Sequence, residues 1–108
     1  MLIKLIDGVR VIARKENGVV KFFSRQGHEF TTLGIIKQEL EGIIEDNFVL
    51  DGEMCVVDNN GNEDYTSIVS QIKRKDYTVQ NPKFMVFDIL TLDEFDNQHA
   101  DTKLSDRL

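Results

Sequence analysis

The 108-residue sequence has a single cysteine, no long apolar run and no excess of basic residues. One cysteine excludes an internal disulfide, and because Cys55 lies in an apolar stretch, we expect it to be a small buried residue. A membrane-spanning helix needs about 20 consecutive apolar residues, and no run approaches that length. The first residues, Met1–Asp7, are too few and too soon charged for a signal peptide. The sequence therefore predicts a cytoplasmic protein that is not secreted and has no membrane partner.

The balance of charge is acidic, with 13 Lys and Arg against 19 Asp and Glu and a net charge of −6. Proteins whose whole surface binds phosphate backbones rely on clusters of Lys and Arg, so the net charge argues against this class. A local nucleic-acid patch, or a basic segment supplied by another domain or chain, remains compatible with the charge. Hydrophobic residues make up 41% of the chain, and the length suits one small domain with one core.

The first part of the chain has the pattern of a β-hairpin. Residues 3–14 predict a strand interrupted at Asp7, because apolar residues alternate with charged or mixed positions after the interruption. The Asn17–Gly18 dipeptide follows, between two apolar-rich runs, and this is a strong short-range indication of a hairpin turn. Residues 19–24 are then expected to form the returning strand.

Two stretches have helical spacing. From Leu33 onward, apolar residues fall at i, i+3, i+7, i+10 and i+11, which predicts an amphipathic helix, and Thr31 or Thr32 is expected to cap its start. The apolar positions within residues 65–72 predict a second helix. The basic run at residues 73–75 is expected in its last turn, where positive charge suits the helix dipole.

The remaining segments predict strands and loops. Residues 48–57 should form a strand with a polar interruption at 51–53, and residues 84–92 another strand. The acidic and polar residues 93–102 indicate a loop, and residues 104–108 the start of a helix. Because the first hairpin is antiparallel, the order strand, strand, helix, strand, helix, strand favours an α+β fold over a doubly wound parallel sheet. We therefore expect a mostly antiparallel sheet with two packed helices.

Four short segments combine glycine, charged residues and aromatic rings. They are Asp7–Arg10, Phe23–Gly27, Leu50–Glu53 and Phe84–Leu90. An Asp-Gly pair is ordinarily a turn, but both pairs here lie inside apolar strands rather than between them. Glycine within a strand often marks a bulge or the close approach of a ligand.

In their order and spacing these segments resemble the covalent nucleotidyltransferases, and most closely the ATP-dependent DNA ligases. That family has Lys-x-Asp-Gly-x-Arg, then Ser-Arg-x-Gly (here Ser24–Gly27), Leu-Asp-Gly-Glu (here Leu50–Glu53) and Val-Phe-Asp-x-Leu (here Val86–Leu90). Leu104–Leu108 is similar to the Leu-x-x-Arg segment that follows. RNA ligases and mRNA capping enzymes share the scaffold. The resemblance implies that residues 1–108 form part of a nucleotidyltransferase (ATP-grasp-like) adenylation domain, without its C-terminal OB-type domain.

The resemblance also implies a reaction. A lysine attacks the α-phosphate of ATP, the AMP passes to the 5′-phosphate of a nick in double-stranded DNA, and the 3′-hydroxyl displaces it. Such an activity serves DNA repair, replication and recombination. Mg²⁺ is expected as cofactor, because phosphoryl transfer generally needs a cation to offset developing charge.

Specific residues carry the implied nucleotide site. Arg10 and Arg25 are expected at the ribose and phosphates because arginine offers forked donors. Glu53 is expected to bind the ribose hydroxyls or a metal, and Phe87 to stack on adenine. The alternatives are that the arginines are ordinary exposed residues and that Phe87 is part of the core. Asp7 and Asp51 are expected to shape the strands. Asp88 is either a second carboxylate near the metal or an outward strand residue.

The chain departs from the family at the nucleophile. The lysine should stand two residues before Asp7, where this sequence has Leu5, and leucine cannot form a phosphoramidate. Lys4 is adjacent, but a shift of one position turns a side chain to the opposite face unless a bulge restores it. We therefore expect the chain alone to be inactive or weak. The alternatives are a non-catalytic nucleotide- or protein-binding module, or completion by a second chain or another copy through open sheet edges.

Overall fold

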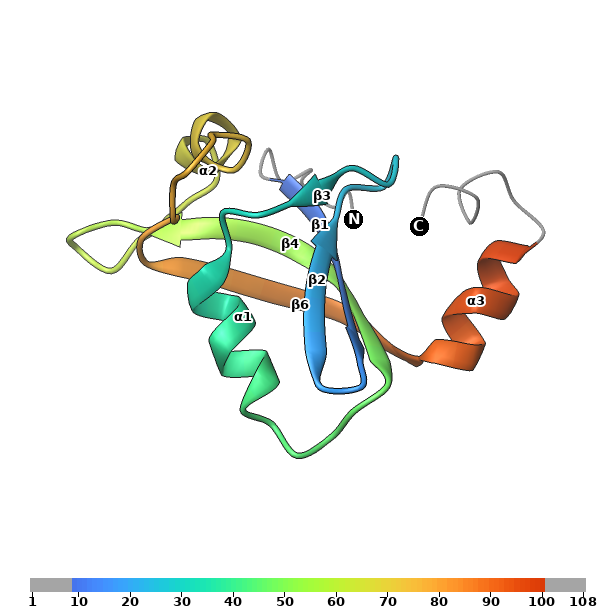
Figure 1. The fold of residues 1–108 in the computed structure, drawn as a ribbon. Helices are drawn as coiled ribbons and strands as arrows, with labels where there is room; N and C mark the ends of the chain where they lie inside the picture. Colours follow the sequence, from blue (N-terminus) through green and yellow to red (C-terminus); the bar gives the residue numbers. More distant parts are fainter. Residues whose placement is uncertain (1–8, 101–108) are drawn as a thin grey trace, which may run out of the picture.

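The computed structural model describes residues 9–100, which form a six-stranded antiparallel sheet with three helices (Figure 1). The expected α+β class is confirmed. The strands lie in the order β3-β2-β1-β4-β5, and β6 pairs with β4. The predicted interruption at Asp7 and the helix expected at 104–108 lie outside the described residues.

The expected hairpin joins β1 (Val9–Glu16) to β2 (Val19–Phe23), which then pairs with the short β3 (Glu29–Phe30). Its turn has positive φ at both central residues, 53° at Asn17 and 81° at Gly18. Asparagine and glycine tolerate this conformation better than other residues, so the dipeptide determines the hairpin locally.

The centre of the sheet is β4 (Phe48–Val57). Its first seven residues pair with β1, and along almost its whole length it also pairs with β6 (Pro82–Thr91). The short β5 (Glu63–Asp64) pairs with the last two residues of β4. Because neighbouring strand residues point to opposite faces, β4 gives the sheet two distinct surfaces.

One surface carries the main core and two helices, α1 (Gly34–Glu41) and α2 (Ser67–Gln71). The core comprises Val11, Ala13, Val20, Phe22, Phe30, Leu33, Ile36, Leu50, Met54, Val56, Ile68, Ile72 and Val79. The opposite surface has a smaller cluster of Ile12, Val49 and Phe95 beneath α3 (Leu92–Ala100). Figure 1 shows α3 beyond the opposite end of the sheet from α2. Within residues 9–100, no helix is long and apolar enough to cross a membrane.

The loop expected at residues 93–102 is wrong for residues 93–100, which belong to α3, so residues 9–100 contain three helices rather than the two expected. Thr91 and Glu94 form a capping box: the Thr91 backbone N–H donates to Glu94 Oε1 at 2.9 Å, and the Glu94 N–H donates to Thr91 Oγ1 at 3.0 Å. Phe95 anchors the helix on the sheet with 3% exposure. The acidic composition of this segment led to the prediction of a loop, although Thr91 and Glu94 are a typical pair for the start of a helix.

Two expected helix-end contacts are also wrong. Leu33 is the N-cap of α1 and makes no side-chain cap, whereas the Thr32 hydroxyl donates to the carbonyl of Ile72 at 2.6 Å. Helix α2 ends at Gln71, so the basic run 73–75 lies beyond its last turn. The start of α2 is held by Asp64, whose carboxylate accepts hydrogen bonds that lower its pKa to about 2.

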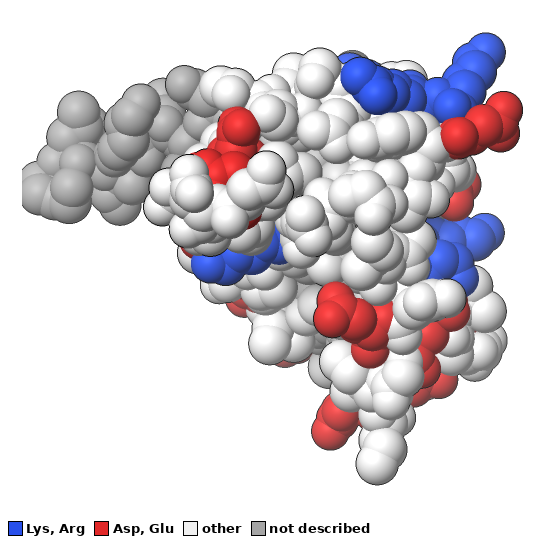
Figure 2. All heavy atoms as spheres, turned by 90° about the vertical axis from the view of Figure 1, so that its left-hand side faces the viewer, with Lys and Arg blue, Asp and Glu red and all other residues white. Residues whose placement is uncertain are grey.

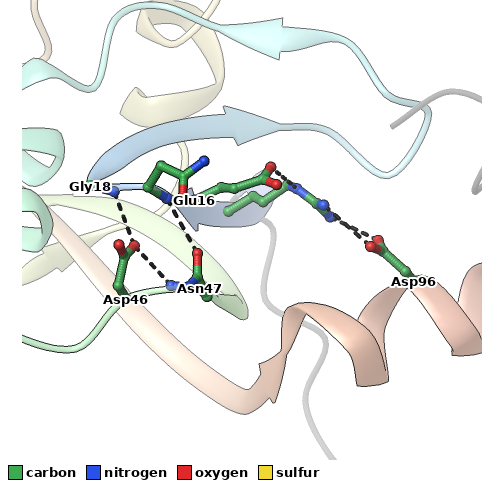
Figure 3. A network of polar contacts seen from close by, with 7 residues as sticks. Glu16, Gly18, Asp46, Asn47 and Asp96 are labelled. Carbon is green, nitrogen blue, oxygen red and sulfur yellow. Dashed lines mark hydrogen bonds and ion pairs between the residues drawn. The ribbon is translucent and has the colours of Figure 1, made fainter.

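The tip of the hairpin is fastened to the segment before β4 (Figure 3). Gly18 N–H donates to Asp46 Oδ1 at 3.1 Å, and the same oxygen accepts the Asn47 N–H at 2.8 Å. From the hairpin, Arg14 reaches α3 and donates to Asp96 at 2.9 Å. The hairpin, the loop before β4 and α3 are therefore connected at one end of the sheet.

Candidate functional site

The sheet surface opposite the main core carries a forked ion pair between β1 and β4. Arg10 Nε and Nη2 donate to the two carboxylate oxygens of Asp51 at 2.7 and 2.8 Å. The two residues are diagonal neighbours, because Arg10 stands opposite Glu53 and Asp51 stands opposite Ile12. Hydrogen bonding to Asp51 raises the pKa of Arg10 above its usual value. The pair fixes the direction of the guanidinium at a partly exposed position.

Phe87 reaches the same surface because β6 has a bulge. Asp51 pairs with Asp88 and Gly52 pairs with Val86, which leaves Phe87 as the extra residue. The Arg10 guanidinium lies over the Phe87 ring, 5.5 Å from its centroid. Phe87 is nevertheless 55% exposed, so it is not part of the core formed by residues 9–100.

Gly52 makes the bulge possible. A Cβ at this position would lie 2.2 Å from the backbone oxygen of Met85 and 2.9 Å from a ring carbon of Phe84. No side chain fits there, so β4 and β6 approach each other only because residue 52 is glycine. The expected bulge or close approach at the second Asp-Gly pair is confirmed as a bulge in the partner strand.

Glu53 is a buried carboxylate on this surface, with 8% exposure. It makes no hydrogen bond or ion pair within residues 9–100, and no fully buried polar atom there lacks a partner, so its oxygens reach the open face. Burial raises the pKa of Glu53, against an opposing effect of the Arg10 charge. Burying a carboxylate without a partner costs folding free energy, so a carboxylate in this position suits the binding of a ligand.

Replacing Glu53 with glutamine is expected to stabilise the chain by about 1 kcal/mol near neutral pH. Folding raises the pKa of the Glu53 carboxyl, so the protonated group stabilises the fold at pH values below its ordinary pKa. This stabilisation is lost as the pH rises through the raised pKa of the folded state. The gain from glutamine should therefore be full at about pH 7.5 and absent at about pH 3.5. Urea unfolding of both proteins at the two pH values measures it, and a gain that persists in acid contradicts the assignment.

Arg25 is exposed in the turn after β2 and joins no ion pair within the described chain. The turn is shaped by Ser24, whose Oγ accepts the backbone N–H groups of Gln26 and His28 at 3.2 and 3.1 Å. Gly27 has a φ of +91°, which suits glycine. The Ser-Arg-x-Gly segment thus forms a defined turn that presents Arg25 to solvent.

The structure brings together Arg10, Glu53 and Phe87 on one face and leaves Arg25 outside their contacts. Lys4 and the position of Leu5 lie outside the described residues. Asp51, expected only to shape the strand, is the forked partner of Arg10. In the sequence, Asp51 stands two residues before Glu53 on one strand, which indicates that both side chains lie on the same face. Only the register between β1 and β4 identifies Asp51 as the partner of Arg10.

The donor set permits a limited metal role. Residues 9–100 contain no group of three or more His, Cys, Asp or Glu side chains arranged to hold a metal ion. Mg²⁺ is commonly bound through one or two carboxylates together with substrate phosphates and water. Glu53 fits that requirement as a single protein ligand, and the described residues do not form a complete metal cage.

The chain matches the model of the ATP dependent DNA ligase domain over residues 3–108. It is 33% identical to a DNA ligase of Methanococcus aeolicus over 78% of this chain and 16% of the relative. It is also 29% identical to the multifunctional non-homologous end joining protein LigD of Pseudomonas aeruginosa, over 78% of this chain and 10% of that protein. The chain thus spans a small part of the length of these relatives.

The fold is similar to that of a solved structure, Pmar-Lig_PreS3. The two agree with a TM-score of 0.68 and 30% sequence identity, over 83% of this chain and 21% of the other. The similarity therefore covers most of this chain and a small part of the other.

Proposed function

The chain belongs to the ATP-dependent DNA ligase domain family, and we propose that the face formed by Arg10, Glu53 and Phe87 binds ATP for the adenylation step of nick sealing. In this proposal the complete ligase acts on nicked double-stranded DNA in repair, replication or recombination. The residues of this chain bind and orient the nucleotide.

The observation that carries the proposal is the exposed Phe87 ring beside a fixed guanidinium. An aromatic ring that is 55% exposed on a glycine-dependent bulge offers a surface for a base. Arg10 lies 5.5 Å from the ring centroid and is already oriented by Asp51, so little side-chain entropy is lost when a ligand binds.

The polar groups suit the rest of a nucleotide. Glu53 accepts hydrogen bonds, which matches ribose hydroxyls, and it is the residue of this face that would hold Mg²⁺ through a carboxylate oxygen. The cation would offset charge on the phosphates when bound. Arg10 and, from its turn, Arg25 offer forked donors to ribose and phosphate oxygens.

Replacing Phe87 with leucine is expected to weaken ATP binding about tenfold, because leucine keeps a similar apolar volume but cannot stack on adenine. Replacement with tyrosine should keep affinity within about twofold, because the ring is retained. Isothermal titration of ATP into the 108-residue chain measures both. Equal affinity of the leucine and tyrosine variants would remove Phe87 from the site.

A matched control is Val69→Ala, which trims another exposed apolar residue, 52% exposed on α2. ATP affinity should not change in this variant. If wild-type chain shows no ATP binding at all, the nucleotide proposal fails as a whole, whatever the variants do.

A second candidate is a module that binds nucleotide without transferring it. Leu5 stands at the family's lysine position, and leucine cannot attack a phosphate, which favours this candidate for the chain on its own. Incubation with Mg²⁺ and α-labelled ATP is expected to leave no acid-labile label on the protein above background. Label that disappears in Lys4→Ala would instead assign the nucleophile to Lys4 and reject the binding-only candidate.

A further inference from the structure

An apolar hollow lies on the core side of the sheet, between strand β6 and the segment that joins α1 to β4. It encloses about 530 Å³, and its apolar lining includes Ile43, Phe48, Leu50, Val86 and Ile89. Three of these side chains are well exposed, Ile43 at 42%, Val86 at 41% and Ile89 at 67%. Exposed apolar side chains that gather in one place and are rimmed by polar groups are typical of an interaction surface.

The bulge in β6 sets both Val86 and Ile89 on this side of the sheet. Val86 pairs with Gly52 and Ile89 pairs with Leu50, and these two β4 positions share one face because they are two residues apart. Leu50 belongs to the main core, so this is the core side. Phe87, the extra residue of the bulge, points to the opposite surface. The apolar hollow and the candidate nucleotide site therefore lie on opposite sides of the sheet.

The wall of the hollow opposite β6 is held in place by contacts from the first hairpin. The buried ammonium group of Lys15 donates to the carbonyls of Ile43 and Glu45, each at 2.7 Å. Asp46 Oδ1 accepts the Gly18 N–H at 3.1 Å. The segment after α1 is therefore fixed before any partner arrives, which lowers the entropy lost on binding.

The rim of the hollow is acidic. Glu45, Asp46 and Glu94 line it, and none of the three forms an ion pair within residues 9–100. No described residue that lines the hollow is Lys, Arg or His. In Figure 2, Asp and Glu predominate over Lys and Arg in the lower part of the molecule, where Figure 1 places the end of α1. A basic partner complements this rim, whereas a second copy of this chain, with net charge −6, brings like charges together.

The surroundings of the hollow favour a helix over a strand as its occupant. Helices α1 and α2 cover the core side of the sheet in the described chain, but Val86 and Ile89 on β6 stay exposed. An amphipathic helix with apolar residues at i, i+3, i+4 and i+7 continues this layer and fills the hollow with side chains. A strand added to the edge of β6 would pair through backbone groups and leave the hollow empty.

We propose that the apolar hollow docks a basic amphipathic helix of a partner protein. The apolar side of that helix lies against Ile43, Val86 and Ile89, and its Lys and Arg side chains meet Glu45 and Glu94 at the rim. This docking does not depend on nucleotide binding, because the two sites use opposite surfaces of the sheet.

The first experiment uses a fluorescein-labelled peptide of roughly 15 residues, built from leucine and lysine with the leucines at helical spacing. Fluorescence anisotropy should show that it binds the 108-residue chain, and circular dichroism should show that it gains helix on binding. A peptide with glutamate in place of lysine, and one in which leucine and lysine alternate as in a strand, should each bind at least about tenfold more weakly. Equal binding of either control peptide overturns the proposal.

Replacing Ile89 with glutamine is expected to weaken binding of the helical peptide about tenfold, because its side chain becomes buried in the complex. The matched control is Val69→Gln on α2, since Val69 is also exposed, at 52%, but does not line the hollow. Its affinity should equal that of the wild type. Thermal melting verifies that both variants keep the fold. The same loss in the two variants would reduce the effect to general surface hydrophobicity and overturn the proposal.

The charge of the rim has its own test. The double variant Glu45→Gln/Glu94→Gln should bind the helical peptide about threefold more weakly at low salt, and the difference should vanish at high salt. Glutamine keeps the capping role of Glu94 at the start of α3. The control Glu29→Gln/Glu39→Gln removes the same charge at exposed positions outside the hollow. Equal losses in the two double variants would attribute the effect to net charge alone and contradict the docking site.

Two further measurements separate the remaining occupants and the two proposals. Sedimentation of the chain alone should show a monomer, and self-association that Ile89→Gln abolishes would assign the hollow to a second copy and overturn the proposal. ATP titration should be unchanged in Ile89→Gln. Failure of the wild-type chain to bind ATP affects only the nucleotide site, and its failure to bind the helical peptide rejects only the docking site.

Discussion

Replacing Gly52 with alanine is expected to lower the free energy of unfolding by about 3 kcal/mol or more. The new Cβ would lie 2.2 Å from the carbonyl oxygen of Met85, and this neighbour is backbone that no rotamer change can move. Relief requires β4 and β6 to separate at the centre of the sheet, and overpacking against rigid surroundings has costs of this order.

Urea denaturation of the wild type and the variant measures this loss. Gly34→Ala is the matched control, because its Cβ would meet only a methyl group of Thr78, at 4.0 Å. Since Gly34 begins α1, alanine there should leave stability unchanged or raise it slightly. A Gly52 variant as stable as the Gly34 variant would show that the bulge does not depend on glycine.

The same substitution connects stability to the candidate site. The bulge opposite Gly52 is what leaves Phe87 unpaired and exposed beside Arg10. A shift of β6 would displace the ring from the guanidinium, so any Gly52→Ala protein that still folds should also bind ATP less tightly than wild type. The effect separates from that of Phe87→Leu because only the glycine variant also loses stability.

Replacing Lys15 with methionine is expected to destabilise the chain by about 3 kcal/mol, although methionine is more hydrophobic and of similar length. Lys15 is 2% exposed, and its ammonium group donates to the carbonyls of Leu40, Ile43 and Glu45 at 3.0, 2.7 and 2.7 Å. Methionine would remove three hydrogen bonds from a charged donor at and beyond the end of α1, where, within residues 9–100, only the Leu40 carbonyl keeps another donor, the Ile43 N–H. Hydrogen bonds to charged groups contribute more to stability than neutral ones.

Thermal and urea unfolding measure the loss. Lys21→Met is the control, because Lys21 is exposed and lies on β2, where it stands opposite Arg14 of β1. It should change stability by less than about 0.5 kcal/mol. A small effect at Lys15 would mean that water replaces the ammonium group at the three carbonyls.

Much of the fold followed from local patterns. The hairpin was predictable because Asn17 and Gly18 suit its turn whatever the rest of the chain does. The strand at 48–57 matched β4, and the predicted 84–92 strand matched most of β6, because long apolar runs with β-branched residues have few alternatives. Helix α3 was missed because its acidic composition outweighed the Thr91–Glu94 capping signal.

Some features of the candidate site also followed from the sequence, and others only from the tertiary structure. The sequence by itself determined the residue types, Arg10, Glu53 and Phe87, and the glycine that lets two strands approach. Only the tertiary structure decided that Asp51, 41 positions away, orients Arg10, that a bulge turns Phe87 onto the same face, and that Lys15 is buried rather than exposed. Turn and cap preferences act between neighbouring residues, whereas register and burial depend on which distant strands pair, and no short segment contains that information.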